Sequence, residues 1–403
     1  MNGKFFSDEK INTGRQPELD ILKALCIVGM VFVHVFLDLG KDVMPTVIDD
    51  YLTEFFGAAT FMVCMGIGMC YMHRQSPSSY FKRGFGLLTI GQFLNILRNS
   101  IPNLIAYKIV GGNFFIANAL LILQSDILSF AGLAFLLMAL LKKLKLNNTA
   151  VLGVGFILNL AALVMWHQLP LPKSYLARQL LGFIVITDAE AYFPLFCYFI
   201  FAAFGYFIGG YYPRIKDKNA LANRIMAICF PVSLGYYVLR FIFEWSYLPE
   251  LGSDMQYNMK PTPDAVATCL FTLGILAVLV KIANLFKNGL PKIVLHVSEN
   301  INSYYCIHYL FVLPMQTVLI AATGERMPGK ILPILYAFGV LFACYFLVNM
   351  NIKHWHIHFA SLKGRQMIIF AVAVWAATVA ITAYAYPRIT EFANVWNDYL
   401  LPE

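Results

Sequence analysis

The chain is a succession of long apolar stretches separated by short polar loops. An α-helix rises ~1.5 Å per residue, so about 20 apolar residues suffice to cross the hydrocarbon core of a bilayer. Counting such stretches predicts about eleven transmembrane helices, with boundaries good to about two to four residues. They cover residues 20–40, 51–72, 84–106, 114–141, 149–167, 191–212, 222–245, 263–286, 293–321, 330–351 and 365–386.

Composition agrees with this prediction. Of the 403 residues, 59% are hydrophobic and only 13% are charged, whereas a soluble domain carries about 25% charged residues. No loop between the apolar stretches is long enough to hold a soluble domain. We therefore expect an all-α, polytopic helical membrane protein.

The loop charges predict the orientation. The loop after the fourth stretch holds Lys142, Lys143 and Lys145, while the loop after the first holds Asp49 and Asp50. Lysine and arginine accumulate in cytoplasmic loops, so the N-terminus is predicted to be cytoplasmic and the C-terminus outside. The net charge of +8 arises from these loops and does not indicate nucleic acid. The predicted parts are a cytoplasmic segment (1–19), a single transmembrane domain (20–386) and an extracytoplasmic tail (387–403).

Two ionisable residues, Lys23 and His34, lie inside the first apolar stretch. Such residues are costly in a membrane span and commonly mark a functional site. Lys23 lies near the cytoplasmic end, and His34 lies eleven residues further, ~16 Å deeper along a helix axis. Asp38 follows His34 by four residues on the same helical face and is a candidate to orient the imidazole. The alternative is that Asp38 marks the outer end of the span.

Three further ionisable residues, Arg98, Asp126 and His308, fall at a depth similar to that of His34 when counted along their spans. With His34 these make four ionisable groups at one depth, and a shared polar cavity explains that better than four unrelated buried residues. Ser303 and Tyr304 lie close to His308 in sequence and add hydroxyl groups to the candidate site. The alternatives are a structural Arg98–Asp126 pair and, for the histidine, hydrogen bonding between helices.

His354, His356 and His358 alternate in the loop after the tenth stretch, a spacing that suits metal binding only on an extended strand. An interfacial basic-aromatic anchor is the preferred interpretation, and no metal cofactor is expected. The eight cysteines lie in apolar segments without a tight metal-binding spacing, which favours a role in packing.

Arg15, Asp20 and Lys23 resemble the opening R-x4-D-x2-R pattern of a group of polytopic acyltransferases. This group joins membrane acyltransferase family three and the heparan-α-glucosaminide N-acetyltransferase-like proteins. Family three has an arginine and, after ten intervening residues, a histidine on its first span, and here the match is Lys23 and His34. Lysine keeps the charge but lacks the bidentate fork of arginine. Residues 122–133, 192–210 and 302–308 resemble the heparan-glucosaminide branch, in the same order.

The resemblance implies an enzyme that transfers an acyl group, usually acetyl, from cytosolic acyl-CoA to a sugar hydroxyl or amine outside. It implies His34 as the catalytic residue, which acts either as a general base or, in the alternative, through a covalent acyl-histidine. The positions described above make Asp38, Asp126 and His308 further catalytic candidates. Candidate donor-binding residues are Lys23, Arg98, Ser303 and Tyr304. The expected partners are acyl-CoA, a glycan or small amino-sugar acceptor and the lipid bilayer of a bacterial inner membrane, with a homodimer left open. The alternative function is a proton-coupled transporter that uses His34, His308, Asp126 and Arg98 as a relay.

Overall fold

A computed structural model describes residues 5–41, 57–168, 172, 174–185, 191–243, 259–355 and 364–389. The regular elements of these residues are all helices, and isolated bridges join Phe6 with Ile215 and Gly40 with Met327. The acidic loop residues Asp49 and Asp50 lie outside the described residues, as do residues 390–403 of the predicted tail.

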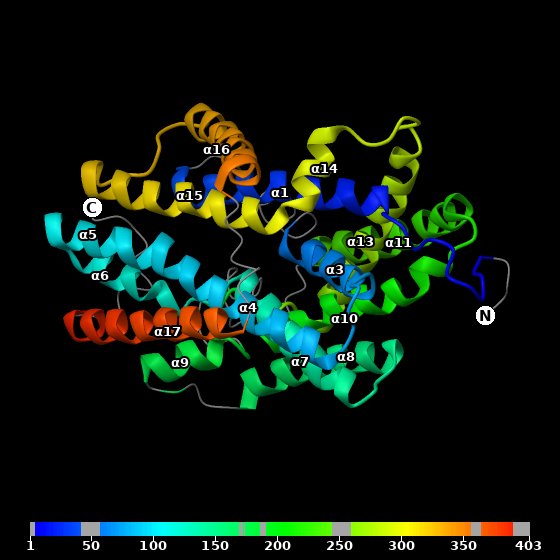
Figure 1. Cartoon of the computed structure of the whole chain (residues 1–403), viewed down its shortest axis with the longest axis horizontal. Coiled ribbons are helices and arrows are strands. Elements are labelled where there is room, and N and C mark those ends of the chain that lie inside the picture. Colours follow the sequence, from blue (N-terminus) through cyan, green and yellow to red (C-terminus); the bar gives the residue numbers. More distant parts are fainter. Residues whose placement is uncertain are drawn as a thin grey trace. The chain divides into compact units, whose positions relative to one another are not determined.

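Eight helices of the described chain are long and apolar enough to cross a membrane (Figure 1). They correspond to the first and to the fifth through eleventh predicted spans, whereas the second to fourth take other forms described below. Of the eleven predicted spans, eight are therefore confirmed as helices long and apolar enough to cross a membrane. Their spans are Pro17–Leu39, Asn148–Trp166, Leu195–Arg214, Lys218–Ile242, Thr262–Ala283, Ile301–Thr323, Ile331–His354 and Arg365–Arg388.

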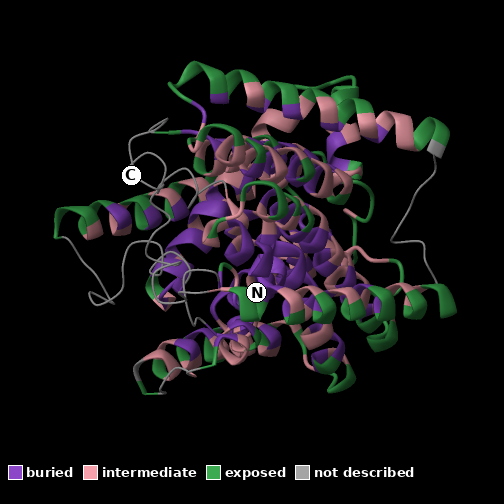
Figure 2. Cartoon of the chain, turned by 90° about the vertical axis from the view of Figure 1, so that its left-hand side faces the viewer, coloured by how far each residue is buried: buried purple, intermediate pink, exposed green. Residues whose placement is uncertain are grey.

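Large apolar side chains cover the exposed faces of several spans. On helix α11 (Lys218–Ile242) they include Ile228, Val232 and Val238, and on α17 (Arg365–Ala385) they include Ile368 and Val379. Figure 2 colours the exposed residues green. Soluble proteins rarely expose apolar patches of this extent, so these faces suit contact with lipid.

The contacts divide the chain into two compact units. The first comprises residues 1–27, 50–82 and 134–299. Its centre is α10 (Leu195–Tyr211), which packs against α3 (Ala58–Cys70) and α8 (Asn148–Gln168) (Figure 1). α11 packs against α13 (Thr262–Ala283), and the unit also holds α9 (Tyr175–Gly182) and α14 (Lys292–Glu299).

Helix α10 approaches α3 closely because glycines face each other. A Cβ atom at Gly205 would overlap the backbone of Val63, and one at Gly66 would overlap that of Ala202. Small residues that permit backbone contact are the usual solution for helix packing in membranes. The segment 192–210 that resembles the acyltransferase group therefore has a packing role here.

The second unit comprises residues 28–49, 83–133 and 300–403. It holds the end of α1 (Pro17–His34) and the π-helical turn η1 (Val35–Leu39). Its remaining long helices are α15 (Ile301–Thr323), α16 (Ile331–Met350), followed by η5 (Asn351–Trp355), and α17, followed by η7 (Tyr386–Arg388). The predicted span 293–321 is not one helix, because α14 ends at Glu299 and α15 begins at Ile301.

The third predicted span is part of a longer helical run of α4 (Pro77–Asn95), the π-helical turn η2 (Ile96–Ser100) and α5 (Ile101–Val110). The fourth, predicted as one helix over 114–141, is interrupted. It consists of α6 (Asn113–Ala119), the 3₁₀ turn η3 (Leu120–Leu123) and α7 (Ile127–Lys143). Residues 124–126 between them are not helical.

Candidate functional site

The break at residues 124–126 is stabilised by polar side chains of the α4–η2 run. Gln92 Nε2 donates to the carbonyl of Ile122 at 2.8 Å, and Asn95 Nδ2 donates to the carbonyl of Gln124 at 3.0 Å. Asp126 accepts a hydrogen bond from the backbone N–H of Ser129 at 2.9 Å and so caps the start of α7. A non-helical backbone in a membrane protein requires such partners, since lipid offers none.

Asp126 also forms a buried ion pair with Arg98, which lies in η2. Arg98 Nη2 and Asp126 Oδ2 are 3.2 Å apart, and the two side chains are 1% and 4% exposed. Tyr305 on α15 donates to the same carboxylate oxygen at 3.2 Å. Two buried charges are tolerated only when they are paired and hydrogen-bonded, as they are here.

Arg98 connects this pair to a tyrosine next to His34. Its guanidinium carbon lies 4.1 Å from the centre of the Tyr309 ring, a cation–π contact. The Tyr309 hydroxyl lies 2.8 Å from Nε2 of His34 and 3.3 Å from Nδ1. His308 completes the cluster, with its ring 4.2 Å from that of Tyr309 and 5.4 Å from that of His34.

The predicted neighbour of His34, Asp38, lies in η1 with Oδ2 3.6 Å from Nδ1 of His34. The His34 and Asp38 side chains are 26% and 27% exposed, far more than Arg98 and Asp126. The η1 turn is fixed by Gln316, whose amide donates to the Asp38 carbonyl at 2.9 Å. The structure thus gathers His34, Asp38, Arg98, Asp126 and His308 around Tyr309, all within one unit.

Three buried nitrogen atoms of this cluster have no hydrogen-bond partner: Nε and Nη1 of Arg98 and Nε2 of His308. Nδ1 of His308 lies 3.2 Å from the Tyr304 carbonyl, which can only accept, so the proton is on Nδ1 and Nε2 carries a lone pair. Buried polar atoms are normally paired, and exceptions are common where chemistry occurs. The cluster therefore offers donors and one acceptor to a bound molecule.

Tyr305 and Tyr309 were not singled out from the sequence. Together with His308 they lie at i, i+3 and i+4 on α15 and share a helical face, which is the signal that could have found them. Of the two hydroxyl residues chosen instead, Ser303 is half-buried at the start of α15. Tyr304 is buried and its carbonyl holds His308.

Lys23 lies in the other unit, in a polar cluster at the start of α1 that centres on Asp20. Asp20 is 2.5 Å from Nε of Arg15 and 3.9 Å from Nζ of Lys23, and it accepts a 2.5 Å hydrogen bond from Ser298. Arg15 also pairs with Glu299. The hydrogen bond to Asp20 raises the pKa of Arg15 above its ordinary value. We call these five residues the Asp20 cluster.

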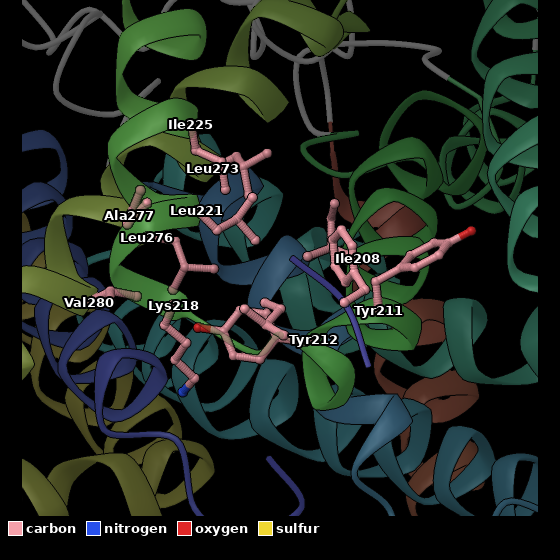
Figure 3. Close-up of a pocket in the computed structure, with 13 residues that line it drawn as sticks. Ile208, Tyr211, Tyr212, Lys218, Leu221, Ile225, Leu273, Leu276, Ala277 and Val280 are labelled. Atoms are coloured by element: carbon pink, nitrogen blue, oxygen red, sulfur yellow. The ribbon is translucent and has the colours of Figure 1, made fainter. Parts of the chain in front are cut away.

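The same unit contains an apolar cavity of about 140 Å³ among α10, α11 and α13 (Figure 3). Its walls include Ile208, Leu273 and Leu276, and Lys218 and Tyr212 lie at one end. Both polar groups are bound to Glu18, with the Lys218 ammonium 2.5 Å from a carboxylate oxygen. None of the site residues predicted from the sequence lines this cavity.

Metal binding finds no support among the described residues, which contain no group of three His, Cys, Asp or Glu side chains suited to a metal. His356 and His358 of the alternating histidine segment lie outside the described residues.

A family comparison identifies the chain's relatives. The model for the catalytic region of heparan-alpha-glucosaminide N-acetyltransferase matches residues 15–240, more than half of the chain. The match includes His34, Asp38, Arg98 and Asp126 and ends before α15. No curated protein and no solved structure matches the chain. With its apolar helices and this match, the chain belongs to the heparan-alpha-glucosaminide N-acetyltransferase family of membrane enzymes.

Proposed function

We propose that the protein transfers an acetyl group from cytosolic acetyl-CoA to an amine or hydroxyl of a sugar on the extracytoplasmic side. The observation that carries this proposal is the cluster of His34, Tyr309, Arg98 and Asp126, four contacting side chains of which three are buried. Most of the cluster's acidic and basic members fall within the region matched by the acetyltransferase family. Nothing in the comparisons favours the transporter alternative.

His34 is the proposed general base. It removes a proton from the acceptor as the acceptor nitrogen or oxygen attacks the thioester carbonyl. The carbon–sulfur bond then breaks, its electron pair goes to sulfur, and the imidazolium returns the proton to give free CoA thiol. The Asp38 carboxylate, 3.6 Å from Nδ1, stabilises the positive imidazolium.

The unpartnered nitrogens supply the remaining interactions. The free N–H groups of Arg98 are candidates to stabilise the oxyanion that forms on the thioester carbonyl. Nε2 of His308 can accept a hydrogen bond from the acceptor and so fix its orientation. Asp126 positions Arg98 through their ion pair. In this proposal Ser303 and Tyr304 of α15 bind the donor.

Lys23 is the proposed contact for the phosphates of the donor at the cytoplasmic end of α1. Its side chain is 30% exposed and lies at the long distance of 3.9 Å from Asp20, so its ammonium can engage an anion. We expect Lys23→Glu to raise the KM for acetyl-CoA with little change in kcat. An unchanged KM would remove Lys23 from the donor site.

Sidedness follows from the loop charges, which favour a cytoplasmic N-terminus and an extracytoplasmic C-terminus in a bacterial inner membrane. Residues 20–386 act as one transmembrane acyltransferase domain in this proposal, although two compact units form it. A reporter enzyme that is active only outside the cytoplasm, fused after Glu403, is expected to be active. An inactive reporter with normal expression would reverse the orientation and place the acceptor in the cytoplasm.

The test of the function uses purified protein, acetyl-CoA and glucosamine as an amino-sugar acceptor. Wild type is expected to bind acetyl-CoA and to release CoA thiol faster when glucosamine is present. His34→Ala should bind acetyl-CoA normally and lose about 10²-fold to 10⁴-fold in turnover, the usual contribution of a general base. His73→Ala, in the exposed loop between α3 and α4, is the matched control and should keep full activity. Wild-type turnover by His34→Ala would disprove the assignment of the base.

A further inference from the structure

Both ring nitrogens of His34 already face protein oxygen atoms. The Tyr309 hydroxyl is 2.8 Å from Nε2, and the Asp38 carboxylate is 3.6 Å from Nδ1. A neutral imidazole has one N–H and one lone pair. The Asp38 carboxylate favours the tautomer with the proton on Nδ1. In that tautomer the lone pair is on Nε2, the nitrogen nearer to the Tyr309 hydroxyl (2.8 Å, against 3.3 Å to Nδ1), and the hydroxyl donates to it. The basic atom of His34 is therefore covered by a tyrosine.

We propose that Tyr309 relays the proton from the acceptor to His34, an inference that rests on the proposed function. A hydroxyl can donate and accept at the same time, so it can pass a proton on without leaving its position. The His34 side chain is 26% exposed, so an acceptor can approach the pair from its open side. Tyr309 thus becomes a catalytic residue that contacts the acceptor, and His34 becomes the final proton carrier.

The surroundings of Tyr309 suit a transient negative charge on its oxygen. The Arg98 guanidinium carbon lies 4.1 Å from the ring centre, and Arg98 is held there by its ion pair with Asp126. A fixed positive charge at a buried ring stabilises charge that develops in the reaction without reorganisation. The rings of His34 and His308 enclose Tyr309 at centroid distances of 4.5 Å and 4.2 Å and limit its motion.

Each bond that breaks in the relay is matched by one that forms. The acceptor's O–H or N–H bond breaks and its proton forms a new bond to the Tyr309 oxygen. The original Tyr309 proton moves to Nε2 of His34, and the acceptor atom forms its bond to the acyl carbon. The carbon–sulfur bond breaks with its electron pair on sulfur, and the imidazolium protonates the thiolate. Tyr309 and His34 end the cycle as they began it.

The first experiment compares two variants that each replace a tyrosine with phenylalanine. Tyr309→Phe keeps the ring below Arg98 and removes only the hydroxyl, so kcat should fall by about 10²-fold with an unchanged KM for acetyl-CoA. Tyr336→Phe on α16 is the matched control, because its hydroxyl donates to the backbone carbonyl of Phe311 at 2.9 Å and not to a side chain of the cluster. It should lose much less turnover. Wild-type kcat in Tyr309→Phe would overturn the relay.

The second experiment uses only the wild-type protein, so it tests the relay even if Tyr309→Phe folds poorly. Single-turnover acetyl transfer by the wild-type protein is measured in mixtures of H₂O and D₂O. Two protons moving in one transition state give a bowed dependence of the rate on the deuterium fraction, and one proton gives a straight line. A bowed curve is expected for wild type, and a straight line would overturn the proposal.

The relay through Tyr309 and the role of His34 as base are disproved by different results. Full turnover by Tyr309→Phe together with an inactive His34→Ala would remove only the relay and leave His34 as the direct base. Full turnover by His34→Ala would remove the proposed base and the relay with it.

Discussion

The Asp20 cluster includes residues from the start of α1, and the cluster around Tyr309 includes His34 from the end of α1. The two clusters differ in how completely their buried polar atoms are hydrogen-bonded. Asp20 is bound by Arg15, Lys23 and Ser298. None of the buried, unpartnered side-chain atoms found in the described part of the chain belongs to that cluster, whereas Arg98 and His308 contribute three.

This difference separates stability from chemistry. Buried groups that are fully hydrogen-bonded have nothing left to offer a substrate, so removing one of them mainly weakens the fold. Within the Asp20 cluster only Lys23, which is 30% exposed, has a proposed role with the donor. A cluster with unpaired buried donors carries an energetic cost that a bound substrate can offset. The residues that resemble the R-x4-D-x2-R pattern therefore mainly stabilise the start of α1. Lys23 is the most weakly bound of them, at 3.9 Å from Asp20.

The largest effect is expected from breaking the central ion pair. Arg98→Met leaves Asp126 as a buried, unpaired charge, which should lower the free energy of unfolding by about 3–5 kcal/mol and abolish transfer. The double variant Arg98→Met/Asp126→Leu should recover much of the stability and none of the activity. Denaturation in detergent and CoA release measure the two properties. Recovery of activity in the double variant would show that the pair is only structural.

Packing away from both clusters should affect stability alone. In Gly205→Leu the new side chain meets the backbone of Val63, so α3 and α10 must separate, with a loss of at least about 1–3 kcal/mol. Gly153→Leu on α8 is the matched control, because no atom lies within 4 Å of its added Cβ. Protein that remains folded should keep its kcat. Equal thermal stability of the two variants would contradict the glycine contact between α3 and α10.

Two conservative carboxylate substitutions test whether one cluster serves stability and the other serves chemistry. Asp20→Asn loses its charged partners and should lower the free energy of unfolding by about 1–3 kcal/mol while kcat stays unchanged. Asp38→Asn should do the reverse: kcat falls because the imidazolium loses its stabilising charge, and stability hardly changes since Asp38 is 27% exposed. Thermal unfolding and CoA release on both variants decide the point. If both variants lost the same property, the division into a structural and a chemical cluster would fail.

The smallest effect is expected at Arg15, whose side chain is 44% exposed. Arg15→Ala should cost about 0.2–1 kcal/mol, and less at high salt. The pKa of Arg15 is raised in the folded protein, so its contribution is present below the ordinary arginine pKa and is lost only as pH rises through the raised value. The stability difference from wild type should therefore stay constant from about pH 6 to about pH 9. A difference that varied across this range would require another titrating partner.

The helical fold and the meeting of distant ionisable groups could be predicted from the sequence, because apolar length and polar depth are local properties. The break at residues 124–126 could not, since the groups that satisfy it, such as Gln92 and Asn95, come from another helix. Tyr309 was missed for a related reason. The sequence signal for Tyr309 is weak, namely the helical face that it shares with His308, and its contacts with His34 and Arg98 appear only in the fold.

Two of the π-helical turns, Val35–Leu39 and Ile96–Ser100, carry Asp38 and Arg98. A π turn accommodates an extra residue within a helix, and such turns recur at functional sites. Deleting one residue in either turn would remove the local bulge, restore a regular helix and change which side chain of that turn faces the cluster. Each candidate charge therefore depends on the insertion of a single residue, and the site could have arisen, or could be lost, by a change of one codon in length.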